Sequence, residues 1–116
     1  MTAALQALLD RVEAGEFPAD TSARDLGIAS DGLPIIKTMY SAFSGSLDAA
    51  KALHEAVIPN HAWDIWRGIG ADCVRYYGCN LPGIDTAYHE DPARAWLIAI
   101  LRALIAASVA ENEGGV

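Results

Sequence analysis

The segment from Asp91 to Ala110, which reads DPARAWLIAILRALIAASVA, constrains the fold more than any other part of the chain. Asp91 is a good helix N-cap, and Pro92 fits the first helical position, where a backbone N–H has no intrahelical acceptor. One stripe at helical spacing holds the large apolar side chains Trp96, Leu97, Ile100, Leu101, Leu104 and Ile105. The pattern predicts a long helix that forms one wall of a small domain. Its other side, with Arg94, Ile98 and Arg102, is expected to be solvated, and contact with a partner is the alternative.

The chain has 116 residues, 53% of them hydrophobic, which is enough for a core without a metal or a disulfide. We expect a single domain over residues 1–110. The polar, glycine-bearing segment 111–116 is expected to be a flexible C-terminal tail.

Three further segments carry helical patterns. Residues 2–14 place Leu5, Leu8, Leu9 and Val12 on one stripe and end at Gly15. A second helix is predicted after the capping residue Ser46 and ends before Pro59, with Leu47, Ala50, Leu53 and Val57 inward and His54 on its boundary or wet face. Residues 33–43 fit a short helix better than a strand. Residues 16–32 are rich in turn formers and predict a loop with one helical turn near 22–26.

A β-hairpin is predicted from the aromatic-rich alternation of residues 62–67 and 72–77 about the turn Gly68–Gly70. Alternation places Trp63, Ile65, Val74 and Tyr76 on the face that covers the helices, and Asp64, Trp66, Cys73, Arg75 and Tyr77 on the other. Residues 78–90 are predicted to be a loop. The fold class is therefore α+β, with helices packed on one face of a small antiparallel sheet as a two-layer sandwich.

The formal net charge is −7, which disfavours general nucleic-acid binding and attachment to an anionic membrane. Such acidity fits a partner with a basic surface, or it serves only solubility. The N-terminus does not read as a signal peptide, and no apolar run approaches the roughly 20 residues of a membrane span. We expect a cytoplasmic protein whose two cysteines, Cys73 and Cys79, are thiols.

Three segments resemble one family of small phage and prophage proteins. They read ALLDRVEAGE (7–16), SLDAAKALHEAVIP (46–59) and DPARAWLIAILRALIA (91–106), and a Trp-rich strand follows the second. The chain is thereby similar to the phage ABA sandwich domain, with departures over 17–41 and 78–90. The resemblance implies a compact α+β sandwich encoded by a phage or prophage. It implies no activity and no catalytic residues.

Residues with catalytic or metal-binding potential do not form a recognisable set. A zinc site from Cys73, Cys79, His61 and His89 would need three separate segments, and its spacing matches no zinc motif. Cys79 would need a nearby histidine to act as a nucleophile, and the acids Asp85, Glu90 and Asp91 surround one predicted loop. Helix capping explains Asp91 equally well. We expect no enzyme activity, no cofactor and no metal.

Trp66, Arg75 and Tyr77 form the leading candidate binding set, because these residue types are enriched in interface hot spots. The alternative is that residues 33–43 cover them. A second candidate set is acidic and would mimic phosphates if it clustered, namely Asp20, Asp25, Asp31, Asp64 and Asp72.

The sequence hypothesis is a phage-encoded, non-catalytic protein that inhibits a host or defence protein in the bacterial cytoplasm, as an anti-CRISPR protein does. The alternative is a phage structural or assembly protein that self-associates, for example as a homodimer, through the hairpin edge or through the outer face of the hairpin.

Overall fold

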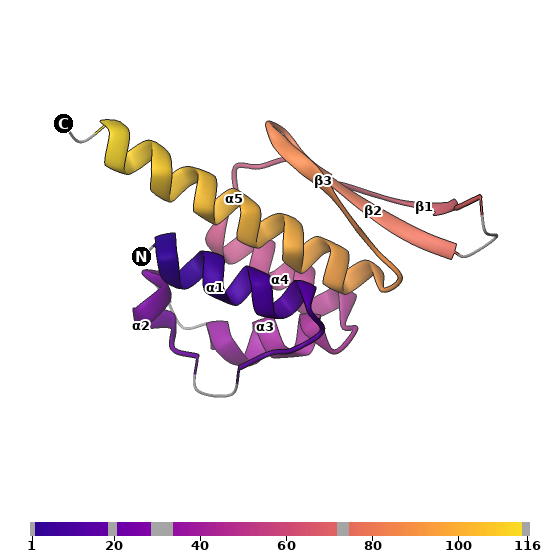
Figure 1. The fold of residues 1–116 in the computed structure, drawn as a ribbon, viewed down its shortest axis with the longest axis horizontal. Coiled ribbons are helices and arrows are strands. Elements are labelled where there is room, and N and C mark those ends of the chain that lie inside the picture. The colour runs from indigo at the N-terminus through magenta and orange to yellow at the C-terminus, as the bar shows by residue number, and fades with distance from the viewer. Residues whose placement is uncertain (1, 19–20, 29–33, 72–74, 115–116) are drawn as a thin grey trace.

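The structure is a computed structural model that describes residues 2–18, 21–28, 34–71 and 75–114. Within these residues it is an α+β domain in which helices pack on one face of a three-stranded antiparallel sheet (Figure 1). Its elements, in chain order, are α1 (Thr2–Glu13), α2 (Ala23–Leu26), α3 (Ile35–Phe43), α4 (Leu47–Val57), β1 (Asp64–Ile69), β2 (Arg75–Leu81), β3 (Ile84–His89) and α5 (Pro92–Gly114). The predicted fold class is confirmed.

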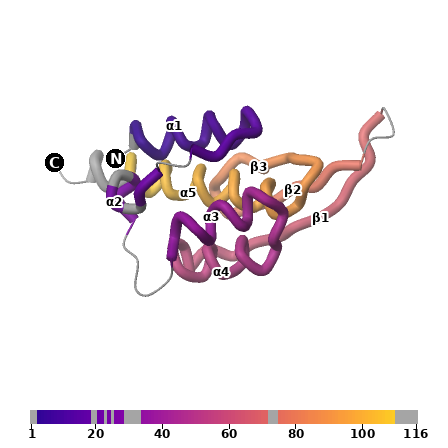
Figure 2. The backbone as a smooth tube through the Cα atoms, turned by 90° about the horizontal axis from the view of Figure 1, so that it is seen from below, coloured from indigo at the N-terminus to yellow at the C-terminus, as the bar shows by residue number. Residues whose placement is uncertain are grey.

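Helix α5 is the central element of the domain. It contacts β2 and β3 on one side, and it lies between α1 and the α3–α4 pair on its other sides (Figure 2). Because α5 is enclosed this way, Ala95–Leu101 are all buried, including Ile98 on the side predicted to be solvated. Residues 92–109 are long and apolar enough to cross a membrane, but half of them are buried inside this domain. The helix ends at Gly114 rather than at the predicted Ala110.

The two arginines of the predicted solvated face bind neighbouring elements. The Arg94 guanidinium donates two hydrogen bonds, of 3.1 and 2.9 Å, to the carbonyl oxygen of Phe43 and lies 3.9 Å from the centre of its ring. This contact joins the start of α5 to the end of α3. Arg102 donates to the carbonyl oxygens of Asp85 and Thr86 at 3.3 and 3.2 Å, so it joins α5 to β3.

The predicted helix boundaries follow from local capping. The α1 stripe is buried as expected, and Gly15 ends the helix at φ +88°. The N–H groups of Gly15 and Glu16 donate to the carbonyls of Val12 and Arg11, which is the Schellman arrangement that favours glycine. Ser46 caps α4 through the Ala49 N–H at 3.1 Å. Asp91 Oδ1 caps α5 by accepting from the Ala93 and Arg94 N–H groups.

The predicted loop 78–90 is wrong, because it holds the end of β2 and all of β3. Pro82 and Gly83 form a tight turn between these strands, and Gly83 has φ +75°. Proline followed by glycine suits the two central positions of a type II turn, so these two residues predict a reversal of the chain at this point. This local signal was present in the sequence.

The predicted register of the first hairpin is also wrong. Trp66 pairs with Gly78 and Arg67 with Tyr77, so even-numbered residues share one face and odd-numbered residues share the other. The prediction paired odd with even positions, and a one-residue slip moves a strand's side chains to the opposite face. Tyr76 therefore leaves the helix-covered face, while Arg75 and Tyr77 move onto it. On that face, the side chains buried in the core are those of Cys79, Leu81 and Ala87.

A buried polar pair lies where α4 crosses α5. His54, predicted at the helix boundary, is 1% exposed. Its Nδ1 accepts from the Trp96 indole N–H at 3.1 Å, so its Nε2 carries the proton and donates to the His61 carbonyl at 2.8 Å. The Trp63 ring lies against Trp96, with centroids 4.4 Å apart. The pair satisfies every nitrogen of the two rings.

Candidate functional site

The sheet surface turned away from the helices carries three packed aromatic rings. We define this outer face by the described residues Asp64, Trp66, Gly68, Tyr76, Gly78, Asn80, Thr86 and Tyr88, which share one side by register. The rings of Trp66, Tyr76 and Tyr88 meet edge to face, with centroids 5.6, 5.7 and 6.0 Å apart. Each strand contributes one ring to this cluster.

Two glycines support the rings from below. Gly78 lies opposite Trp66, and a Cβ added there would clash with the indole ring. Gly68 lies opposite Tyr76, where an added Cβ would be 2.7 Å from the phenol ring. The rings therefore lie down across the backbone of the neighbouring strand, an arrangement that also stabilises a glycine within a strand.

No described helix covers the outer face. The helices all lie on the opposite side of the sheet (Figure 1). The alternative cover, residues 33–43, is wrong for its described part, because α3 packs on α4 and α5. Tyr88 is consequently 59% exposed. Large aromatic clusters left open on a sheet are typical of contact surfaces.

The structure divides the predicted binding residues. Trp66 and Asp64 lie on the outer face, whereas Arg75 and Tyr77 lie on the inner one. Asp20, Asp31, Asp72 and Cys73 fall outside the described residues, as does the side chain of Asp25, so clustering of the acidic set stays a prediction. Sequence reasoning missed Tyr76 and Tyr88 as members of the cluster. The Pro82–Gly83 turn was the signal that leads to Tyr88.

Near the β1–β2 connection, the inner face extends beyond the cover of α5 (Figure 1). We call the four side chains there the tip patch: Arg67, Ile69, Arg75 and Tyr77. Ile69 is 70% exposed, and both arginines are exposed. The patch concentrates positive charge on an otherwise acidic chain.

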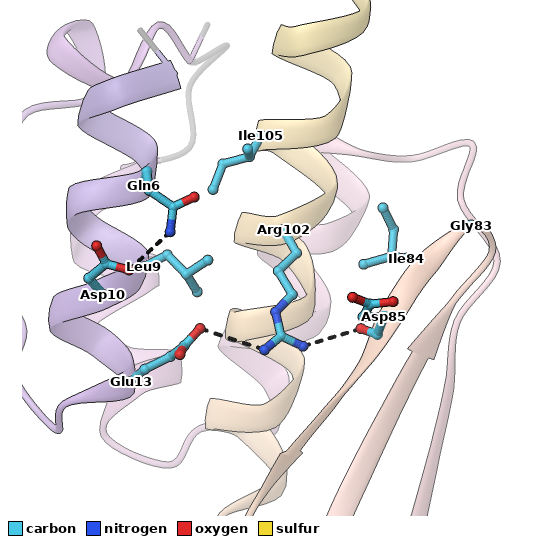
Figure 3. A pocket seen from close by; sticks show the side chains of 9 residues that line it. All are labelled: Gln6, Leu9, Asp10, Glu13, Gly83, Ile84, Asp85, Arg102 and Ile105. Atoms are coloured by element: carbon cyan, nitrogen blue, oxygen red, sulfur yellow. Dashed lines mark hydrogen bonds and ion pairs between the residues drawn. The ribbon is translucent and has the colours of Figure 1, made fainter.

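At the opposite end of β2, a pocket of about 450 Å³ lies between α1, α5 and the start of β3 (Figure 3). We call it the end pocket. Leu9, Ile84 and Ile105 form its apolar wall, and Arg102 crosses it toward Glu13 at 3.6 Å. Its remaining charged side chains are the carboxylates of Asp10 and Asp85.

The residues considered for catalysis come from several elements, and Cys79 and His89 share the inner face of the sheet. Cys79 is fully buried, and burial together with the charge of Asp64 raises the pKa of its thiol to about 12. A thiol with so high a pKa is a poor nucleophile. Asp85 lies near the start of β3, whereas Glu90 and Asp91 follow its end. Within the described residues, no three side chains of His, Cys, Asp or Glu gather as a metal site.

His89 makes stability depend on pH. Burial, assisted by the Arg94 charge, lowers the pKa of His89 against the opposing effect of Asp91 and Glu90. The unprotonated Nδ1 accepts from the Asp91 N–H at 2.9 Å, directly before α5.

Because the unfolded chain binds this proton more readily, the stability contributed by neutral His89 is present above pH ~6.5 and is lost as pH falls through the lower folded pKa. We expect urea unfolding to show a smaller loss of stability between pH 7.5 and 5.5 in His89→Asn than in the wild type. Equal losses in both proteins would contradict the assignment.

Comparison of the chain with protein-family models, with curated proteins and with solved structures gives no match. The resemblance to the phage ABA sandwich domain therefore stays a prediction from the three segments that carry it.

Proposed function

We propose that this chain is a small, non-catalytic binding protein that contacts a protein partner through its outer face. The observation that carries the proposal is the cluster of Trp66, Tyr76 and Tyr88, which no described helix covers. Tryptophan and tyrosine are the residues most enriched in interface hot spots, because they bury a large area with few rotatable bonds. Packing of the rings on each other and on glycine pre-organises the surface and lowers the entropy lost on binding.

The charge of the outer face favours a partner with basic side chains. Among its described residues Asp64 is charged, and none is Lys or Arg, since Arg67 and Arg75 point to the other side. The open ring of Tyr88 can accept an arginine guanidinium over its face. The net charge of −7 would speed the approach of such a partner.

The family resemblance extends this proposal to the partner's origin. A phage- or prophage-encoded binder of this kind would occupy a surface of a host or defence protein in the bacterial cytoplasm, as an anti-CRISPR inhibitor does. Occupying that surface would block whatever the partner normally binds there. This mode of action needs contact area and no chemistry.

Two exposed tyrosines allow a matched test. Tyr88 is 59% exposed on the outer face, and Tyr40 is 56% exposed on α3. The tagged wild type is used to capture a stoichiometric partner from bacterial lysate, and the affinity of the purified partner is then measured by calorimetry. We expect Tyr88→Ser to weaken binding by about 30-fold or more, the effect of a hot spot. Tyr40→Ser should leave the affinity unchanged.

Two results would count against the outer face. One is equal weakening by both tyrosine variants, which would indicate a general loss of structure. The other is a captured partner whose affinity is lowered by Tyr40→Ser alone. Circular dichroism of both variants identifies any unfolding before affinities are compared.

A further inference from the structure

The tip patch holds two arginines that make no ion pair or side-chain hydrogen bond with any described residue. By contrast, Arg11, Arg94 and Arg102 each bind a carboxylate or a carbonyl. Arg67 pairs with Tyr77 and Ile69 with Arg75, so the two arginines are diagonal neighbours on adjacent strands, with backbone positions roughly 7–8 Å apart. The exposed side chain of Ile69 lies beside them. The patch thus presents one apolar group flanked by two unpaired guanidinium groups.

The end pocket presents the complementary chemistry. Its lining holds three carboxylates and one guanidinium, which gives a net charge of minus two beside an apolar wall. The Arg102 guanidinium already donates to two carbonyl oxygens and forms an ion pair with Glu13. Asp10 accepts the neutral Gln6 amide at 2.9 Å, and the Asp85 carboxylate binds no cation among the described residues. Figure 3 shows Asp10 on the α1 side of the pocket and Asp85 beside Ile84 on the β3 side, with Ile105 of α5 between the two sides.

From this match we infer that a second copy of the chain occupies the end pocket through its tip patch. Ile69 of one copy would contact the apolar wall of the next, while Arg67 and Arg75 would reach the carboxylates of Asp10 and Asp85. Arginine suits this role because its planar fork binds a carboxylate through two hydrogen bonds. The positive charge of the tip equals the net negative charge of the pocket, so the contact neutralises both.

The positions of the two features determine the kind of assembly. The tip patch adjoins the start of β2 and the end pocket adjoins its far end, about 20 Å away for seven residues of strand. A copy bound in the pocket therefore leaves its own pocket and the first copy's tip free. Such a head-to-tail contact repeats, giving rings or filaments rather than a closed two-fold dimer. The contact uses neither Trp66 nor Tyr88, so it is independent of the proposed partner site.

The test uses two full-length variants that each retain one half of the contact. The tip variant carries Arg67→Glu and Arg75→Glu, and the pocket variant carries Asp10→Lys and Asp85→Lys. A control, Asp48→Lys with Glu55→Lys, makes the same charge change as the pocket variant at exposed positions on α4. Sedimentation velocity is recorded over a range of protein concentrations in low salt and again in about 0.5 M salt, where charge pairs at the surface are screened.

We expect the wild type and the control to associate with rising concentration in low salt and to dissociate in high salt. Each variant alone should be a monomer, and their equimolar mixture should give a discrete 1:1 dimer. The dimer forms because the intact pocket of the tip variant receives the intact tip of the pocket variant. The inference is overturned by a monomeric wild type at every concentration, by a mixture that stays monomeric, or by a pocket variant that associates as the control does.

Discussion

Leu101→Ala is expected to lower the free energy of unfolding by roughly 3.5 kcal/mol, the middle of the range for leucine truncation in a closed core. Leu101 is fully buried on α5, the helix that contacts the sheet on one side and α1, α3 and α4 on the others. The elements packed around α5 would have to move together to fill the cavity, so little relaxation is available to reduce the loss. Urea unfolding followed by circular dichroism measures the change.

Leu47→Ala is the matched control, because the same atoms are removed from α4 at a position that is 44% exposed. The sequence pattern placed Leu47 inward, so the pair also tests which leucines the fold uses. We expect the control to cost less than about 1 kcal/mol. Similar losses at both positions would contradict the central place of α5.

His54→Leu is expected to cost about 2 kcal/mol, although leucine is close to histidine in size and is apolar. The substitution removes the acceptor of the Trp96 indole N–H and the donor to the His61 carbonyl, inside the core. Leaving a buried polar group without its partner costs about 1–3 kcal/mol. The measurement is again equilibrium unfolding in urea.

A double-mutant cycle separates this hydrogen bond from packing. Trp96→Phe removes the indole donor, so His54→Leu should cost less in that background than in the wild type. We expect a coupling energy of about 1 kcal/mol between the two positions. A coupling near zero would show that the loss at His54 comes from shape alone.

The parts of the fold that local chemistry determines were predictable from sequence. Asp91, Ser46 and Gly15 mark helix ends because each satisfies backbone groups within a few residues of itself. The stripe of α1 is buried as its spacing requires. These signals act within one or two helical turns, so a single sequence shows them.

The errors concern choices that depend on distant residues. His54 lies in the core because it binds Trp96, which is 42 residues away in the chain. No residue near His54 in the sequence indicates this contact, so the pattern predicted a position at the helix boundary. The register of β1 with β2 changes face with a one-residue shift, and the turn sequence alone left it open. The members of the candidate site depend on that register. The predicted register placed Trp66 of β1 on the correct face, but it assigned Tyr76 of β2 to the wrong one. The missed turn between β2 and β3 differs from these errors, because the local sequence Pro82–Gly83 indicates a turn.

The helices cover only part of the sheet, and this affects how the strands move. Cys79, Leu81 and Ala87 are buried in the core at one end of the sheet, whereas at the other end Ile69 is 70% exposed and the strands β1 and β2 extend past the helices (Figure 1). Local opening needs the least free energy where few apolar contacts are lost, so the strands should fray from the tip while the base stays closed. A molecule that binds the tip would then also hold the ends of β1 and β2 in their paired conformation. Part of its binding free energy would offset the entropy that these residues lose.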